Sequence, residues 1–225
     1  MIVIASHVNY QKACTIMLND LNAVGVNWND VAIVIAGSDK DIIVQDPRGF
    51  VVIQVTTNFF ELSAVYGISK YLDHECFKGV DHFVFLQDTI QIRKHFLKMY
   101  GNFVEDMKTN GADVYYASAD RKCNIAGLSR SFITTHGVKY GITADKDKAW
   151  KAEHNGDYSY VKFAEESGMK VVDAPTDALW LPGLVNYPDS EIKRCMVYFP
   201  ALDLFKLVAT CDEGVNPPWQ ERCSP

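Results

Sequence analysis

Short apolar runs alternate with amphipathic segments along most of the chain. Residues 2–5 and 31–36 are apolar throughout, which is typical of strands that are covered on both faces of a sheet. Residues 11–24 instead repeat apolar side chains at i, i+3, i+4 and i+7, and this spacing predicts an amphipathic helix that ends at Gly25. Strands that alternate with helices predict an α/β fold, with a mainly parallel central sheet and helices on both faces.

The same patterns predict the remaining elements as far as about residue 175. Further strands are expected at residues 42–44, 50–55, 82–86, 114–117 and 170–172, and further helices after Asn58, from about residue 92 to 107, from about residue 130 and from 157 to 167. After Pro175 the signal weakens, and only a helix around residues 201–209 is indicated. We expect a single domain over residues 1–212 and a tail or linker at 213–225, so the full-length chain could carry further domains.

Composition excludes several classes of protein. The net charge of -6 and the pI near 5.5 argue against a nucleic-acid surface, which needs clustered Lys and Arg. The six cysteines contain no CxxC pair, as expected of reduced thiols in an intracellular protein. No basic leader and no apolar run of about 20 residues is present, so we expect a soluble, cytoplasmic protein without a membrane span.

Polar residues gather where three predicted strands end. They are Ser6, His7 and Asn9 after the first strand, Ser38, Asp39 and Asp41 after the second, and Gln87, Asp88 and Thr89 after the strand that begins at His82. Ligands of such sheets bind outside the carboxyl ends of the strands, so these groups are candidates for one site. The chain has no GxGxxG, GxxxxGK[ST] or GxSxG motif, which disfavours a dinucleotide site, a P-loop and a hydrolase elbow.

The order of these motifs resembles that of GT-A fold glycosyltransferases, the nucleotide-diphospho-sugar transferases, and in particular the inverting, single-domain kind. The similar segments are "IVIASHVN", "VIAGSDKD", "NFFELSAVYGISKYL", "FVFLQDT", "IAGLSRSFITTHG" and "GDYSYVKFAEESGMKVV", which together cover residues 1 to about 175. The short chain is also similar to the compact GT-A domains encoded by large algal viruses. The resemblance implies a hexosyltransferase that uses a UDP-sugar and Mn²⁺ or Mg²⁺, with a glycan or another hydroxyl compound as acceptor.

Asp88 stands where the family has its acidic DxD-type motif, although Gln87 and Thr89 replace the usual acids. The resemblance therefore implies that Asp88 holds a divalent cation shared with the donor diphosphate, and that Gln87 lies beside the donor. Mg²⁺ and Mn²⁺ bind one or two carboxylates together with phosphate oxygens, and such a cation stabilises the negative charge on a departing diphosphate. The alternative is that Asp88 only caps a following helix.

The resemblance also assigns roles to the other candidates, each beside a structural alternative. Asp39 would contact the uracil or ribose, or only form a turn. Ser6 and Asn9 would border the nucleotide, or only begin the first helix. His7 would contact the diphosphate, or have only a structural role. Arg130 would hold a phosphate or lie at the surface. Asp157 would be the catalytic base, with Glu153 as the second candidate, or Asp157 would only cap a helix.

Two functions from different classes remain open on the sequence. The first is an inverting, metal-assisted glycosyltransferase. The second is a catalytically weak or inactive GT-A scaffold that binds a sugar nucleotide or glycan, because the acidic motif keeps one acid only. Nucleotidyl transfer is disfavoured, since no glycine-rich, basic phosphate loop follows the first strand.

Overall fold

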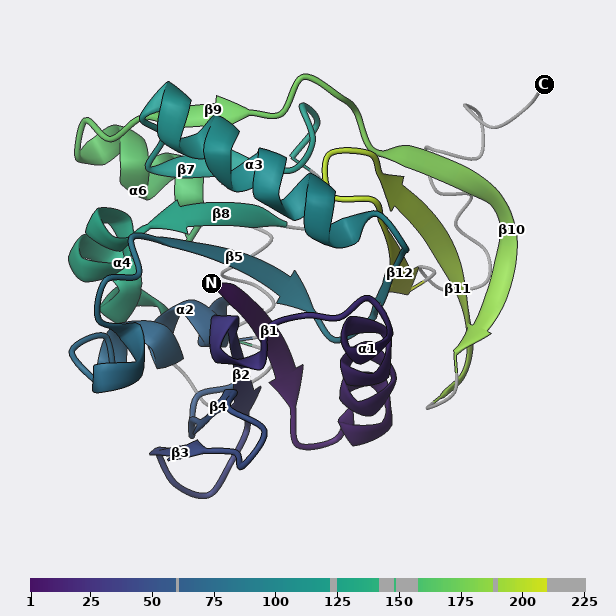
Figure 1. Ribbon diagram of the computed structural model, residues 1–225, viewed down its shortest axis with the longest axis horizontal. Helices are drawn as coiled ribbons and strands as arrows, with labels where there is room; N and C mark the ends of the chain where they lie inside the picture. Colours follow the sequence, from purple (N-terminus) through teal and green to yellow (C-terminus); the bar gives the residue numbers. More distant parts are fainter. Residues whose placement is uncertain (60, 122–124, 142–147, 149–157, 188–189, 210–225) are drawn as a thin grey trace.

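A large mixed sheet forms the centre of the protein. The computed structural model describes residues 1–59, 61–121, 125–141, 148, 158–187 and 190–209 (Figure 1). The sheet has the order β3-β4-β2-β1-β5-β8-β7-β9. Its strands are β1 (Ile2–His7), β2 (Val31–Ala36), β3 (Ile42–Gln45), β4 (Val51–Gln54), β5 (His82–Gln87), β7 (Val114–Tyr116), β8 (Ala126–Ser129) and β9 (Val171–Asp173). The strands β4, β2, β1 and β5 are mutually parallel, so their carboxyl ends meet at one edge.

A second, antiparallel sheet packs beside the first. It has the order β10-β11-β12-β6 and consists of β6 (Ile90–Ile92), β10 (Leu179–Tyr187), β11 (Ser190–Phe199) and β12 (Leu204–Ala209). The strand β6 follows β5 after two residues and pairs with β12, so the second sheet is attached directly to the carboxyl end of β5. Figure 1 shows β10 and β11 as long strands on the side of the molecule where α1 lies.

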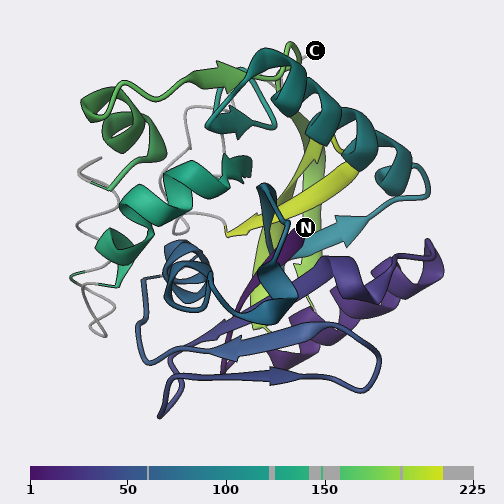
Figure 2. The same cartoon turned by 60° about the vertical axis from the view of Figure 1, so that its left-hand side comes forward.

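Helices cover both faces of the central sheet. The helices are α1 (Gln11–Ala23), α2 (Leu62–Lys70), α3 (Phe96–Asn110), α4 (Arg130–His136) and α6 (Tyr160–Glu166). The helices α2, α4 and α6 share one apolar core with the sheet, while α1 and α3 share the other core with the opposite sheet face and with β11 and β12. Figure 2 shows these two groups of helices on opposite sides of the strands.

Local sequence explains how closely these layers approach. Gly67 of α2 faces Val34 of β2, and a Cβ at position 67 would lie 2.6 Å from Val34 Cγ1, so only glycine lets this helix pack so near the sheet. The α4 helix begins where Ser129 accepts a hydrogen bond at its Oγ from the N–H of Phe132, at 3.0 Å. These two features place α2 and α4 against the same face of the sheet.

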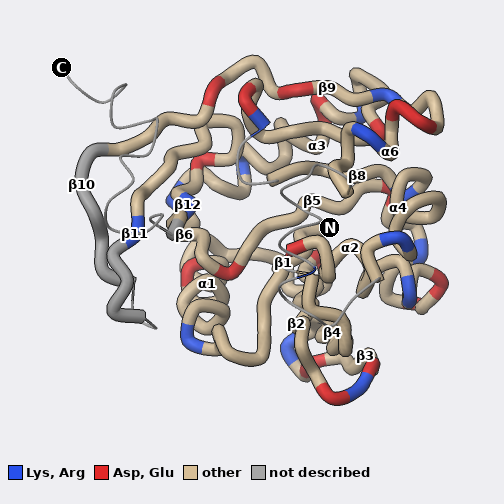
Figure 3. The backbone as a smooth tube through the Cα atoms, turned by 180° about the vertical axis from the view of Figure 1, so that it is seen from behind, with Lys and Arg blue, Asp and Glu red and all other residues tan. Residues whose placement is uncertain are grey.

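Charged side chains lie on helices and loops and on β9, β11 and β12, whereas β1, β5 and β8 carry no Lys, Arg, Asp or Glu (Figure 3). This agrees with central strands that are buried on both faces. Among the described residues, no helix has the length and apolar character that crossing a membrane requires.

The structure confirms most of the predicted elements up to residue 173 and corrects two. The helix expected from about residue 92 begins at Phe96, because residues 90–92 form β6. The helix expected around residues 201–209 is wrong, since residues 204–209 form the strand β12. The expected mainly parallel sheet with helices on both faces is present, and the second, antiparallel sheet was not predicted. The expected tail at 213–225 lies outside the described residues.

Candidate functional site

A cleft of about 470 Å³ opens where the carboxyl ends of β1, β2 and β5 meet the second sheet. The strand ends and the adjoining loops contribute most of its wall, and two basic residues come from β11 and β12. The lining residues are Ala5, Ser6, His7, Asn9, Tyr10, Ala36, Asn58, Glu61, Gln87, Asp88, Thr89, Arg194 and Lys206. The structure thus brings together five residues predicted from the sequence, namely Ser6, His7, Asn9, Gln87 and Asp88.

Asp88 is the buried acid of the cleft. Its backbone N–H donates to the carbonyl of Ala5 at 3.0 Å, which continues the pairing of β5 with β1 beyond the end of β5. Its carboxylate is held by Ser6, whose Oγ donates to Asp88 Oδ2 at 2.8 Å, and only 7% of Asp88 is exposed. The helix-cap alternative is wrong, because β6 follows Asp88 and the N-cap of α3 is His95.

The α1 helix places the thiol of Cys14 near the same pair of residues. Burial and the negative charge of Asp88 together raise the pKa of Cys14 to about 11, although a hydrogen bond with Ser6 opposes part of the shift. The thiol therefore stays protonated at neutral pH. Asp88 is thus an acid enclosed by Ser6 and Cys14 on the protein side, while it lines the cleft on the other.

His7 has a fixed orientation beside this acid. Its Nδ1 accepts a hydrogen bond from the N–H of Asn9 at 3.2 Å, and its ring lies 5.8 Å from the ring of Tyr10. Gly37 lies against the imidazole with φ +73°, and a Cβ at this position would come within 2.5 Å of His7 Nε2. Glycine is therefore required here twice, for the left-handed backbone and for the space that the imidazole occupies.

Two basic residues of the cleft were missed by the sequence analysis. Lys206 is 7% exposed, and its ammonium donates to Thr89 Oγ1. Arg194 reaches the cleft from β11. The sequence feature that could have identified Lys206 is its place in the otherwise apolar run "LFKLVA", because lysine is unusual in a buried strand. The sequence analysis interpreted this segment as a helix and therefore did not consider it.

Two other predicted residues, Asp39 and Arg130, lie elsewhere, and two fall outside the described residues. Asp39 is exposed in the loop after β2 and does not line the cleft. Arg130 lies at the start of α4, and its guanidinium donates to the carbonyls of Phe77, Val80 and Leu72 at 2.8 to 3.3 Å, which is a structural role. Asp157 and Glu153 lie outside the described residues.

The donor set of the cleft suits a hard divalent cation. The oxygen-bearing side chains of Asp88, Glu61, Asn9 and Asn58 line it together. Within the described residues no three His, Cys, Asp or Glu side chains form a ready-made metal cluster. Mg²⁺ and Mn²⁺ commonly bind through one or two carboxylates and complete their coordination with water and substrate phosphate. The residues present therefore include the oxygen donors that such a cation uses.

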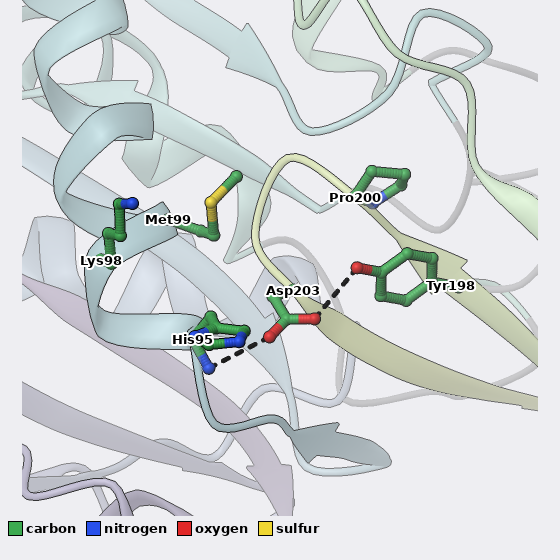
Figure 4. Close-up of a pocket in the computed structure, with 6 residues that line it drawn as sticks. All are labelled: His95, Lys98, Met99, Tyr198, Pro200 and Asp203. Atoms are coloured by element: carbon green, nitrogen blue, oxygen red, sulfur yellow. Dashed lines mark hydrogen bonds between the residues drawn. The ribbon is translucent and has the colours of Figure 1, made fainter.

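A second cavity, of about 280 Å³, lies where the turn between β11 and β12 meets the start of α3. Asp203 organises it: the Tyr198 hydroxyl donates to Oδ1 at 2.9 Å and the N–H of His95 donates to Oδ2 at 3.1 Å (Figure 4). The Arg93 guanidinium lies 3.4 Å from the same carboxylate. Through these contacts the carboxylate of Asp203 links the β11–β12 hairpin to the start of α3. We therefore interpret this second cavity as a structural feature of the fold.

Comparisons with known proteins find similarity among solved structures alone. No protein-family model matches the chain, and no curated protein matches it. A solved structure of the galactosyltransferase LgtC, in complex with donor and acceptor sugar analogues, aligns over 77% of this chain and 73% of its own, with 10% identity and a TM-score of 0.41. At these values the likeness supports no conclusion about activity, and nothing in it supports a viral origin.

Proposed function

We propose that this protein is a glycosyltransferase that moves a sugar from a UDP-sugar to an acceptor hydroxyl, with the help of a divalent cation and with inversion at the anomeric carbon. The observation that carries the proposal is the cleft at the carboxyl ends of β1, β2 and β5. It holds a buried acid at the end of β5, an ordered imidazole and two basic side chains. This combination of charges suits a diphosphate with its metal.

Asp88 has the central role in this proposal. Ser6 keeps one carboxylate oxygen in place, so the acid needs little reorganisation when a ligand arrives. Asp88 would hold the cation together with donor oxygens, and the cation would supply neutralisation of the charge that develops on the departing diphosphate. His7 and Asn9 would form the wall next to the donor, in an orientation that Gly37 allows.

The acceptor side of the reaction rests on the sequence alone. Inversion needs a base that takes the proton of the acceptor hydroxyl while the hydroxyl attacks from the face opposite the diphosphate. We assign this role to Asp157, with Glu153 as the second candidate. On the donor side, we propose that Asp39 contacts the nucleoside, and this role also comes from the sequence alone.

The first test is a thermal-shift panel of UDP, GDP, CDP and TDP, each with and without Mn²⁺. Ligand binding stabilises the folded state by RT ln(1 + [L]/Kd), about 2.7 kcal/mol at a hundredfold excess over Kd. We expect UDP with Mn²⁺ to give the largest increase in Tm. No shift with any nucleoside diphosphate, with or without metal, would refute a sugar-nucleotide site.

A binding module without turnover is the second candidate, and one observation favours it. Asp88 lies between Gln87 and Thr89, so the strand end offers a single carboxylate where a cation could use two. Release of UDP from UDP-sugars in the presence of Mn²⁺ separates the two candidates. Binding without any release of UDP, over a panel of UDP-sugars and acceptors, would favour the module.

A further inference from the structure

Lys206 occupies a position that the fold would ordinarily give to an apolar residue. It lies in β12 directly opposite Ile90 of β6 and Val197 of β11, which are 1% and 0% exposed. Lys206 itself is 7% exposed. Lysine is almost never buried to this degree, because an ammonium removed from water costs free energy unless other charges compensate. A leucine or methionine would fill the same space at lower cost.

The backbone pairing places Lys206 next to the cleft. The N–H of Leu207 donates to the carbonyl of Thr89 at 3.0 Å, and Lys206 pairs in register with Ile90. The side chain therefore starts beside the turn that follows β5, and its ammonium donates to the hydroxyl of Thr89 at the cleft. Thr89 directly follows Asp88 in this turn. The ammonium of Lys206 therefore lies in the part of the cleft that contains Asp88.

The charges of the cleft are balanced as long as no ligand is bound. Its lining contains two acidic residues, Asp88 and Glu61, and two basic residues, Arg194 and Lys206. A nucleotide-sugar diphosphate adds negative charge that a divalent cation would neutralise. The acids then match the metal and the bases match the phosphates, so each charged group has a partner of opposite sign.

We propose that Lys206, together with Arg194, binds the diphosphate of the donor directly, so that part of the nucleotide affinity does not depend on metal. This inference rests on the proposed function and extends it to the second sheet. The Lys206 side chain is buried and donates to Thr89, so a charge-assisted hydrogen bond from its ammonium to a phosphate oxygen would cost little further loss of freedom. The contact concerns phosphate, so uridine gains nothing from it.

The test uses Lys206→Met in the full chain, with Lys108→Met as the control. Methionine keeps the unbranched stem without the charge, and Lys108 is an exposed lysine of α3 whose replacement changes the net charge equally. Titration calorimetry measures the Kd of UDP and of uridine, each in EDTA and in Mn²⁺. A companion Arg194→Gln variant tests the second base in the same way.

Lys206→Met should weaken UDP about 10- to 100-fold in both EDTA and Mn²⁺, the usual range for a hydrogen bond to a charged group. Uridine affinity should stay unchanged, as should UDP binding by Lys108→Met. The Tm of Lys206→Met without ligand should equal or exceed that of the wild type, because an apolar residue in a buried position relieves the cost of the charge.

Three results would overturn the inference. Wild-type UDP affinity in Lys206→Met would show that the ammonium does not reach the diphosphate. Equal losses for UDP and uridine, or a lowered Tm, would make Lys206 a structural residue. Binding of UDP by the wild type that vanishes entirely in EDTA would assign all phosphate affinity to the metal. None of these three results would contradict the proposed function. If the wild type bound no nucleotide at all, both the proposed function and the role of Lys206 would be refuted.

Discussion

Asp88→Asn is the substitution that separates the roles of charge and shape at the end of β5. Asparagine keeps the size of the side chain, and its Oδ1 can still accept the hydrogen bond that Ser6 now donates at 2.8 Å. The local structure should therefore persist, while the negative charge that would hold a cation is removed. We expect the metal-dependent part of UDP affinity to disappear and transfer to fall by orders of magnitude.

The size of the effect follows from the environment of the carboxylate. Two unit charges about 4 Å apart interact by about 4 kcal/mol at an effective dielectric constant near 20, which corresponds to about a thousandfold in affinity. Asp88 is 7% exposed, so solvent screens it little. Part of the interaction is offset by the lost desolvation cost of the acid, and we expect a loss between about tenfold and about a thousandfold in the presence of Mn²⁺.

The assay compares the Kd of UDP with Mn²⁺ and in EDTA for the wild type and for Asp88→Asn. Asp113→Asn is a matched control, because Asp113 accepts a hydrogen bond from Ser129 Oγ at the same 2.8 Å but lies outside the cleft. The control should bind UDP like the wild type. Unchanged metal-dependent binding in Asp88→Asn would refute the assignment of Asp88 to the metal.

Three further predictions concern Asp39, Asp157 and Cys14. Asp39→Ala should weaken UDP and uridine alike, by about tenfold, and a loss for UDP alone would place Asp39 at the diphosphate instead. Asp157→Asn should lower kcat by about 10²- to 10⁴-fold with donor affinity intact and an inverted product, whereas near-normal turnover or a retained anomeric configuration by NMR would favour Glu153. Since the folded-state pKa of Cys14 is about 11 against an ordinary 9.0, the unfolded thiol ionises first, and the free energy of unfolding should decrease as pH rises between those values. Cys14→Ala should reduce that slope in urea titrations, and an unchanged slope would contradict it.

The central sheet could be predicted because its signals are local. An apolar run such as residues 31–36 and the helical repeat of residues 11–24 each determine an element without reference to the rest of the chain. The α/β alternation then places the strand ends at one edge, and five of the predicted residues do line the cleft there.

The second sheet could not be predicted by the same means. The strand β12 has buried residues on both faces of its sheet. The apolar residues in its sequence therefore recur with neither a clear period of two nor one of 3.6. The three residues of β6 are too few to show a period and lie just before the strong helical stripe of α3. Pairing between β6 and β12 joins segments more than a hundred residues apart, and only the folded structure reveals such a register.

The same long-range pairing decides the chemistry of the cleft. The sequence brings acids and amides to the strand ends, but the bases come from β11 and β12, and Thr89 and Lys206 are 117 residues apart. Asp203 fixes the turn between these strands by accepting hydrogen bonds from Tyr198 and from the backbone of His95, at the start of α3. The position of Lys206 beside the cleft is therefore set by the pairing of β12 with β6. The contact that we propose between Lys206 and phosphate depends on this long-range pairing, whereas the proposed role of Asp88 depends on the local end of β5.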